Sequence, residues 1–223
     1  MNNSKPVLIE LHFLPCVDYF LSIINSSEIN FDISERYQKQ SFRNRTLILG
    51  ANKTLILTVP VQHNSQGIMK DIKIENSQNW KKIFLKTIQS SYRKSPYFEH
   101  YYDYIDNIIN TDFIYLWELN YKLLTTCLQF MNLNVGVNIV DHHTSEMCIN
   151  KKDLRNIINN KKNYYNKDII GRLSYTQTFG RKFVNNLGII DILFCEGNYT
   201  LNLLQNVLKH NEIPNEQILL SEC

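Results

Sequence analysis

The chain has 223 residues, of which 43% are hydrophobic and 20% are charged, and its formal net charge is +3. These values predict one globular domain with a buried core and exclude a largely disordered chain. The positive charge is too small to indicate a nucleic-acid or membrane-binding protein, so any basic site has to be local.

The first elements follow the pattern of a βαβ unit. Val7–Leu14 is a short apolar run before Pro15, which predicts a buried strand. Residues 17–24 place apolar side chains at helical spacing, and Glu28–Ile33 alternates again as a second strand. Such a unit is expected to be right-handed, with parallel strands.

A hairpin and three helices are predicted next. Thr46–Val61 contains two apolar runs around GANK, where Gly50 and Asn52 allow the positive φ of a turn. The alternating segment DIKIE (Asp71–Glu75) predicts an edge strand. Amphipathic helices are predicted over residues 79–131, which either cover one face of the sheet or form a helical subdomain.

The remaining segments complete an α/β fold. VNIVDHH predicts a strand that returns to the sheet, and Lys151–Asn166 is expected to be loop or a short surface helix. An apolar run, a break at Gly197 and a final helix follow. The fold class is therefore α/β, with a mixed sheet opened by the βαβ unit and extended by the hairpin, in a single domain over residues 1–223.

Several classes of site and location are not expected. The five cysteines form no CxxC pair, and the N-terminus lacks the apolar run of a signal peptide, so a cytoplasmic protein with reduced thiols is predicted. No apolar run approaches the roughly 18 residues of a membrane span. His142 and His143 are adjacent on a predicted strand and would point to opposite faces, so no metal is expected. GxGxxG and GxxxxGK[ST] loops are absent, and no cofactor is predicted.

The segment YQKQSFRNR, between the βαβ unit and the hairpin, is the first candidate site. If it is extended from Ser41, Arg43 and Arg45 share one face, while Asn44 faces the other side and holds backbone. Together with Tyr37 and Lys39 they would lie near the carboxyl ends of the parallel strands, where open sheets bind ligands. Arginine forks and a lysine charge suit a phosphate or a carboxylate.

The alternative is a solvated segment whose arginines pair with nearby acids such as Asp32 and Glu35. Two further groups are candidates to act with the cluster. His12, after the first strand, is expected to line the same cavity. Asp191 lies in the apolar run GIIDILF, where an ionised carboxylate is costly unless it is paired or hydrogen-bonded. It is either the acid that balances an arginine and acts as general base, or a helix N-cap or structural ion pair.

A third region, SSYRKSPYFEHYYDYI, interleaves tyrosines and basic residues. Tyr92 and Tyr97 could stack on a nucleobase or a sugar. The alternative is a core of tyrosines at helical spacing, with hydroxyl groups that reach its rim.

In order along the chain, these segments resemble the WbqC-like proteins of bacteria. The similarity lies in the YxK…RNR segment with the hairpin ending LTVPV, in NWKKIFLKTIQSSYRKSPYFEHYYDYI, in LWELNYKLL, and in YTQTF…NLGIIDILFCEGN, which matches a closing YxQxF…NLSILDLLFNEG pattern. Gly188 and Cys195 depart from that pattern, which usually has Ser and Asn.

The resemblance implies a pathway rather than a reaction. It implies a cytoplasmic transferase of O-antigen (lipopolysaccharide) or other surface-polysaccharide biosynthesis, of glycosyl or acyl type, that acts on a nucleotide sugar or another activated anionic donor. The alternative is a non-catalytic binding or assembly protein of the same pathway. A nucleic-acid partner is not expected, and the number of subunits is not set by the sequence. The candidate catalytic residues are Asp191 and His12, and the candidate substrate-binding residues are Tyr37, Lys39, Arg43, Asn44, Arg45, Tyr92, Tyr97 and Gln177.

Overall fold

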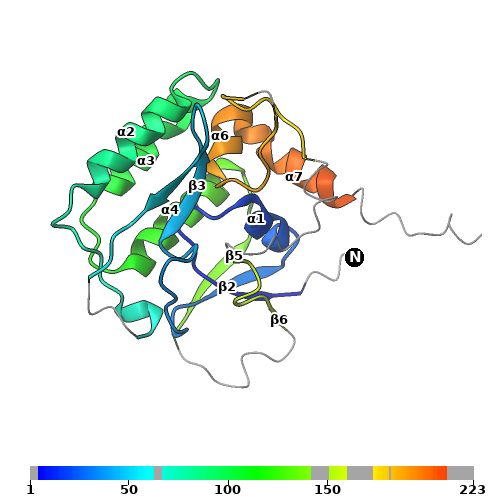
Figure 1. Cartoon of the computed structure of the whole chain (residues 1–223). Coiled ribbons are helices and arrows are strands. Elements are labelled where there is room, and N and C mark those ends of the chain that lie inside the picture. The colour runs from blue at the N-terminus through cyan, green and yellow to red at the C-terminus, as the bar shows by residue number, and fades with distance from the viewer. Residues whose placement is uncertain (1–4, 63–66, 142–150, 160–172, 181, 210–223) are drawn as a thin grey trace, which may run out of the picture.

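The computed structural model describes residues 5–62, 67–141, 151–159, 173–180 and 182–209 (Figure 1). The predicted α/β fold is confirmed. Four parallel strands form a sheet in the order β5–β2–β1–β6, and two antiparallel strands form a separate hairpin. The strands are β1 (Val7–Glu10), β2 (Glu28–Asp32), β3 (Arg45–Leu49), β4 (Thr54–Thr58), β5 (Gly136–Val140) and β6 (Lys152–Asp153). The helices are α1 (Val17–Ile23), α2 (Trp80–Tyr92), α3 (Phe98–Asn110), α4 (Leu116–Phe130), α6 (Ile190–Glu196) and α7 (Thr200–Lys209).

The βαβ unit at the start of the chain is confirmed. Strand β1 is buried at every position, and it pairs in parallel with β2 from Val7↔Ile29 to Glu10↔Asp32. The sequence of a strand that is covered on both faces is a continuous apolar run, and this run made β1 predictable. The predicted return strand is β5, which continues the sheet beside β2. Strand β6 lies on the other side of β1, in a segment expected to be loop or helix.

The hairpin does not extend the parallel sheet, contrary to the detail predicted. Strand β3 is instead held against the segments before α1 and α6. The Thr46 hydroxyl donates to the Leu14 carbonyl at 2.8 Å, and the Gly188 N–H donates to the Leu47 carbonyl at 2.7 Å. The expected edge strand at residues 71–75 is also absent, since only isolated bridges form there after a short 3₁₀ helix, η1 (Met69–Asp71).

One hydrophobic core joins the sheet to the helices. It includes Ile9 of β1, Ile88 of α2, Leu123 of α4 and Phe194 of α6. Figure 1 shows α2 and α3 side by side to the left of the hairpin, with α1, α6 and α7 toward the other side of the molecule. The predicted break at Gly197 is confirmed, because α6 ends there with φ +61°, a conformation that favours glycine.

Gly188 is required by close packing. A Cβ atom there would lie 2.4 Å from Thr46 Oγ1 and 3.1 Å from the Leu47 carbonyl oxygen. Gly188→Ala is therefore expected to lower the free energy of unfolding by about 1–3 kcal/mol, the usual cost of overpacking. Urea denaturation measures this, with Gly136→Ala as the matched control, since its Cβ would meet only Glu28 Cγ at 3.6 Å. Equal effects of the two substitutions would contradict the packing account.

Candidate functional site

Polar residues gather where the parallel strands end. Glu10 ends β1, Asp32 ends β2 and Asp153 ends β6. The chain passes from β1 to β2 and β5 on one side, whereas β6 joins β1 on the other side, so strand order reverses between β1 and β6. Ligands bind to open parallel sheets at the carboxyl ends of the strands beside such a reversal. A cavity of about 420 Å³ lies there, which we call the edge cavity. Its lining residues are Ser34, Glu35, Arg36, Gln38, Asp153, Arg155 and Asn156.

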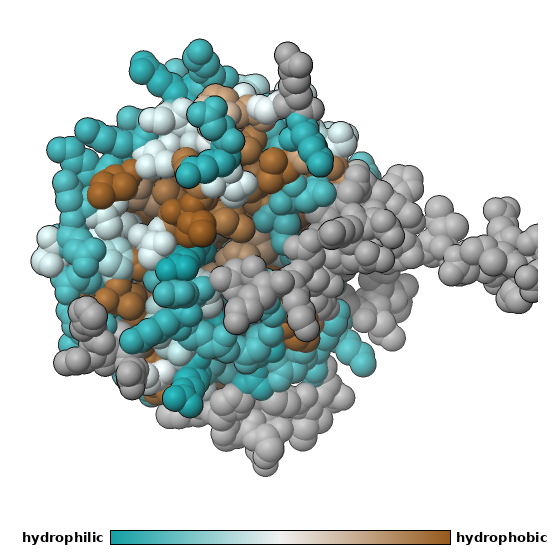
Figure 2. All heavy atoms as spheres, in the orientation of Figure 1, coloured by the Kyte–Doolittle hydropathy of each residue, from teal (hydrophilic) through white to brown (hydrophobic). Residues whose placement is uncertain are grey.

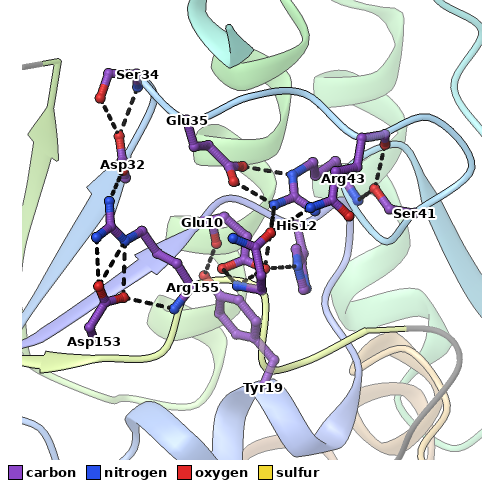
Figure 3. A network of polar contacts seen from close by, with 12 residues as sticks. Glu10, His12, Tyr19, Asp32, Ser34, Glu35, Ser41, Arg43, Asp153 and Arg155 are labelled. Carbon is purple, nitrogen blue, oxygen red and sulfur yellow. Dashed lines mark hydrogen bonds and ion pairs between the residues drawn. The ribbon is translucent and has the colours of Figure 1, made fainter. Parts of the chain in front are cut away.

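Arg43 does not line the edge cavity, but it forms a buried ion pair with Glu35, which does. Its Nε donates to Glu35 Oε1 at 2.7 Å, and its Nη2 donates to Glu35 Oε2 and, at 2.9 Å, to Asn156 Oδ1. Nη2 also lies 3.7 Å from Glu10 Oε1, so one guanidinium faces two carboxylates (Figure 3). The side chain is only 3% exposed. The pairing of Arg43 with Glu35 agrees with the alternative prediction, but the arginine is buried and not solvated as that alternative expected.

Glu10 and His12 form a second pair beside Arg43. His12 Nε2 lies 3.2 Å from Glu10 Oε1, and the Asn156 N–H donates to both Glu10 oxygens at 3.2 and 3.1 Å. Tyr19 donates from its hydroxyl to the Glu10 carbonyl at 2.8 Å. Because an ionised carboxylate only accepts, Nε2 carries the proton, and the neutral ring keeps its lone pair on Nδ1. No hydrogen-bond partner of Nδ1 occurs among the described residues.

The environment drives the pKa values of these groups apart. Burial raises the pKa of Glu35 to about 7, since the negative charges of Glu10 and Asp32 add to the burial and outweigh the bonds from Arg43. Burial opposes ionisation of Glu10 too, but the hydrogen bond from His12 and the charge of Arg43 bring its pKa below the usual value. Burial also lowers the pKa of His12. At neutral pH we therefore expect Glu10 to be ionised and His12 to be neutral, whereas Glu35 is divided between its protonated and ionised forms.

The raised pKa of Glu35 predicts a pH dependence of stability. Between the ordinary glutamate pKa and about 7, the folded state keeps a proton that the unfolded state has released, so stability falls as pH rises through this window. Glu35→Gln should flatten that fall. Urea unfolding of both proteins from pH 4.5 to 8 measures it, and NMR of the Glu35 carboxyl carbon gives the pKa directly. A Glu35 that titrates near its ordinary value would contradict the assignment.

Arg155 connects the ends of β2 and β6. Its Nη1 donates to Asp32 Oδ2 at 2.7 Å and its Nε donates to Asp153 Oδ1 at 2.9 Å. Asp32 also accepts from the Ser34 hydroxyl at 2.7 Å. These contacts hold Asp153, Arg155 and Ser34, three of the residues that line the edge cavity. Arg36 differs from the other arginines here, since its exposed side chain forms no ion pair within the described residues.

The other residues of YQKQSFRNR are placed as follows. Asn44 donates to the Val59 carbonyl at 2.9 Å, the backbone-holding position expected of it. Lys39 is exposed. Tyr37 is 7% exposed, and its hydroxyl and Arg45 Nε are buried atoms without a hydrogen bond in the described part of the chain. The charges of Arg43 and Arg45 both act on the Tyr37 hydroxyl, although burial is the larger influence and raises its pKa to about 12.

Asp191 belongs to a different cluster, so the prediction that it balances an arginine of YQKQSFRNR is corrected. Its carboxylate accepts from Tyr92 at 2.8 Å, from Tyr175 at 2.6 Å and from Gln177 at 3.1 Å. Burial raises its pKa against these three hydrogen bonds. The acid that pairs with Arg43 is Glu35, which is eight residues away in sequence. We call Asp191, Tyr92, Tyr175 and Gln177 the Asp191 cluster; it holds the segment around residue 175 against α6.

The contacts of Tyr97 are structural: a backbone hydrogen bond and the packing of its ring. Its N–H donates to the Phe194 carbonyl at 3.0 Å, and its ring fills the space beside Gly197.

Asn156 and Arg155 were not identified from the sequence, because residues 151–159 have no apolar pattern. The left-handed φ of Asn156, +61°, is the conformation that directs its N–H to Glu10 while its side chain receives Arg43.

The comparisons identify the family. A sequence model of the WbqC-like protein family matches residues 11–171, and the chain belongs to this family. The match begins directly after β1, contains the arginine segment and Asn156, and ends before Tyr175, Gln177 and Asp191. Comparisons with curated proteins and with solved structures gave no match.

Two further searches bear on the class of site. Among the described residues, no group of three or more His, Cys, Asp or Glu side chains could hold a metal ion, and His142 and His143 lie outside those residues. No described helix has both the length and the apolarity needed to cross a membrane.

Proposed function

We propose that this protein is a transferase of surface-polysaccharide biosynthesis that binds an activated sugar, such as a nucleotide sugar, in the edge cavity. The observation that carries the proposal is the position of a glutamate with a pKa near 7 in the wall of a cavity at the strand-order reversal. The pathway comes from the resemblance to WbqC-like proteins. The residues that line the cavity support the proposed substrate class.

The charge of the edge cavity suits a polyhydroxylated group. Its charged lining residues are Glu35, Asp153, Arg36 and Arg155, two acids and two bases, and an amide or a hydroxyl is supplied by Ser34, Gln38 and Asn156. A sugar hydroxyl both donates and accepts, so it can use carboxylate and amide groups side by side. A phosphate in the same place would face the two carboxylates.

The donor phosphate is therefore assigned to the rim of the cavity. Arg36 is the cation of the lining without an ion pair among the described residues, and the exposed Lys39 follows three residues later. Arg43, which sequence reasoning favoured for this role, instead fixes Glu35. The anionic partner stays a prediction, with Arg36 as its principal contact.

Glu35 is the general base of the proposed reaction. Each of its oxygens accepts one hydrogen bond from Arg43 and keeps a second lone pair. As the acceptor oxygen or nitrogen bonds to the anomeric carbon, its proton passes to Glu35. The bond from that carbon to the donor phosphate breaks, and the phosphate leaves with the electron pair. Neither His12 nor Asp191 lines the edge cavity, so His12 acts here by holding Glu10.

A non-catalytic binding protein of the same pathway is the second candidate. It is favoured by one observation, that Arg43 and Arg155 are already paired with acids, as in a rigid recognition site. Such a protein would bind the sugar without turnover.

The test combines binding and turnover. Thermal shift is measured with nucleotide sugars, free sugars and acyl-CoA, followed by donor consumption in the presence of cell-wall sugar acceptors. We expect nucleotide sugars to stabilise the protein, Arg36→Gln to weaken their binding about tenfold or more, and Lys122→Gln to have no effect. Glu35→Gln should retain binding and lose turnover by about 10²–10⁴. Binding without turnover in the parent protein would select the second candidate, and stabilisation by none of these compounds would overturn both.

A further inference from the structure

Helix α2 has a basic stripe on its exposed side. Lys82, Lys86 and Arg93 are all exposed, and their spacing of four and seven residues places them along one face of a helix. The helix contains no Asp or Glu. Two lysines one turn apart repel each other. No carboxylate of the described residues forms an ion pair with any of the three, so the fold leaves this charge unbalanced.

Exposed aliphatic side chains accompany the basic stripe. Ile83 is 62% exposed on the adjoining part of the same face. Ile56 is 60% exposed on β4, an element that packs against α2. Figure 2 shows hydrophobic surface where Figure 1 draws the hairpin, with hydrophilic side chains around it. A single exposed isoleucine is ordinary, but isoleucine beside a row of cations is the composition of helices that lie in a membrane interface.

A cavity that contains two basic residues lies at the C-terminal end of α2. This cavity, about 350 Å³, is lined by Arg93 and Lys94, by the hydroxyl-bearing residues Ser90, Ser91 and Thr178, and by Gln89 and Phe179. The two cations Arg93 and Lys94 suit a phosphate ester, whereas the Ser90 hydroxyl donates to the Lys86 carbonyl at 2.8 Å. The cavity continues the basic stripe, since Arg93 belongs to both.

We propose that α2 lies flat against an anionic phospholipid surface. The basic stripe faces the lipid phosphates, Ile83 inserts between headgroups, and the cavity at Arg93 receives one phosphate group. A second copy of the chain fits less well, because the stripe would face another row of cations. Nucleic acid also fits less well, because Ile83, the exposed apolar residue of α2, is aliphatic, and the ring of Phe179 at the cavity is half-buried.

The neighbouring acids do not neutralise the stripe. Glu99, Asp103 and Asp106 lie on α3, which packs along α2 on the side of Gln89, where Gln89 donates to Tyr102 at 2.8 Å. On the helix circumference, Ile83 and Lys94 lie on the opposite side of the stripe from Gln89. The lipid surface is thus approached from the side of Ile83.

The experiment is flotation of the full chain with vesicles of phosphatidylcholine alone or with 30% phosphatidylglycerol added. Each lysine near an anionic surface contributes roughly fivefold in affinity, so Lys82→Glu with Lys86→Glu should weaken binding by roughly 25-fold or more. The matched control is Lys122→Glu with Lys209→Glu, two exposed lysines on α4 and α7. Both pairs take the net charge from +3 to −1, so only the position of the charge differs. Ile83→Ser should weaken binding severalfold while the salt dependence is kept.

Binding that requires phosphatidylglycerol, falls with salt and is lost with the α2 pair but not with the control pair supports the proposal. It is overturned if vesicles with phosphatidylglycerol do not bind the protein at low salt, or if both pairs lose binding equally. Stronger retention by single-stranded RNA, abolished by the α2 pair, would also overturn it and assign the stripe to nucleic acid. The proposed function is unaffected by these results, because the basic stripe and the edge cavity share no residue.

Discussion

Replacing Arg43 by Met is expected to lower the free energy of unfolding by about 3–5 kcal/mol, the largest effect of any single substitution considered for this protein. The substitution would leave Glu35 without its two hydrogen bonds and Glu10 without its nearest guanidinium, with both carboxyl groups buried. Asn156 Oδ1 would also lose a donor. Urea denaturation at pH 8, where Glu35 is ionised, measures the full effect.

A double variant separates the ion pair from general packing. Adding Glu35→Gln to Arg43→Met removes the isolated charge as well, so part of the lost stability should return. Arg43→Lys should also destabilise the protein, because lysine keeps the charge and loses the two-pronged contact with Glu35. An Arg43 that only bound ligand would tolerate lysine with an unchanged melting temperature. That outcome would contradict the ion-pair account.

Asp191→Ala is expected to have the second largest effect, a loss of about 2–4 kcal/mol. It would remove the common acceptor of Tyr92, Tyr175 and Gln177, and each buried donor left without a partner costs about 1–3 kcal/mol unless it rearranges. Tyr92 would still accept from the Leu49 N–H at 3.1 Å. The effect is thus one of stability, with the Asp191 cluster acting as a clamp.

Conservative variants provide the controls for Asp191. Asp191→Asn keeps one acceptor oxygen and should cost less than Ala, and Tyr175→Phe should cost about 1 kcal/mol, the value of one hydrogen bond. Thermal unfolding and donor turnover are measured together. If Asp191→Asn abolishes turnover in a protein of unchanged stability, Asp191 is catalytic, as sequence reasoning proposed, and the clamp account is wrong.

The parts of the fold that depend on local pattern could be predicted from the sequence. The apolar run of β1, the helical spacing of α1 and the alternation of β2 together determine a parallel βαβ unit. The two apolar runs around GANK determine the hairpin, although neither Gly50 nor Asn52 adopts the positive φ predicted for its turn. The place of the hairpin could not be predicted, because it depends on contacts of Thr46 and Gly188 with residues more than 30 positions away.

The position of the segment YQKQSFRNR at the carboxyl ends of the strands was predicted, but its contacts were not. The sequence placed YQKQSFRNR near the carboxyl ends of the strands, and the structure brings Arg43, Glu10 and His12 together there. Which acid balances Arg43 could not be read from spacing, since Glu35 and Asp191 were both open. Strand β6 and the turn after it supply Asp153, Arg155 and Asn156, and a strand of two residues is too short to give a periodic signal.

The most direct test of the central claim is NMR mapping of the ligand on the protein. Backbone amide shifts are followed while UDP-N-acetylglucosamine is added, with UDP and N-acetylglucosamine alone as comparisons. The claim that the edge cavity binds the sugar predicts that the nucleotide sugar and the free sugar shift the amides of Glu35, Gln38 and Asn156, whereas UDP alone shifts that of Arg36 most. Shifts confined to the Asp191 cluster, or unchanged amides around the edge cavity at saturating nucleotide sugar, would contradict it.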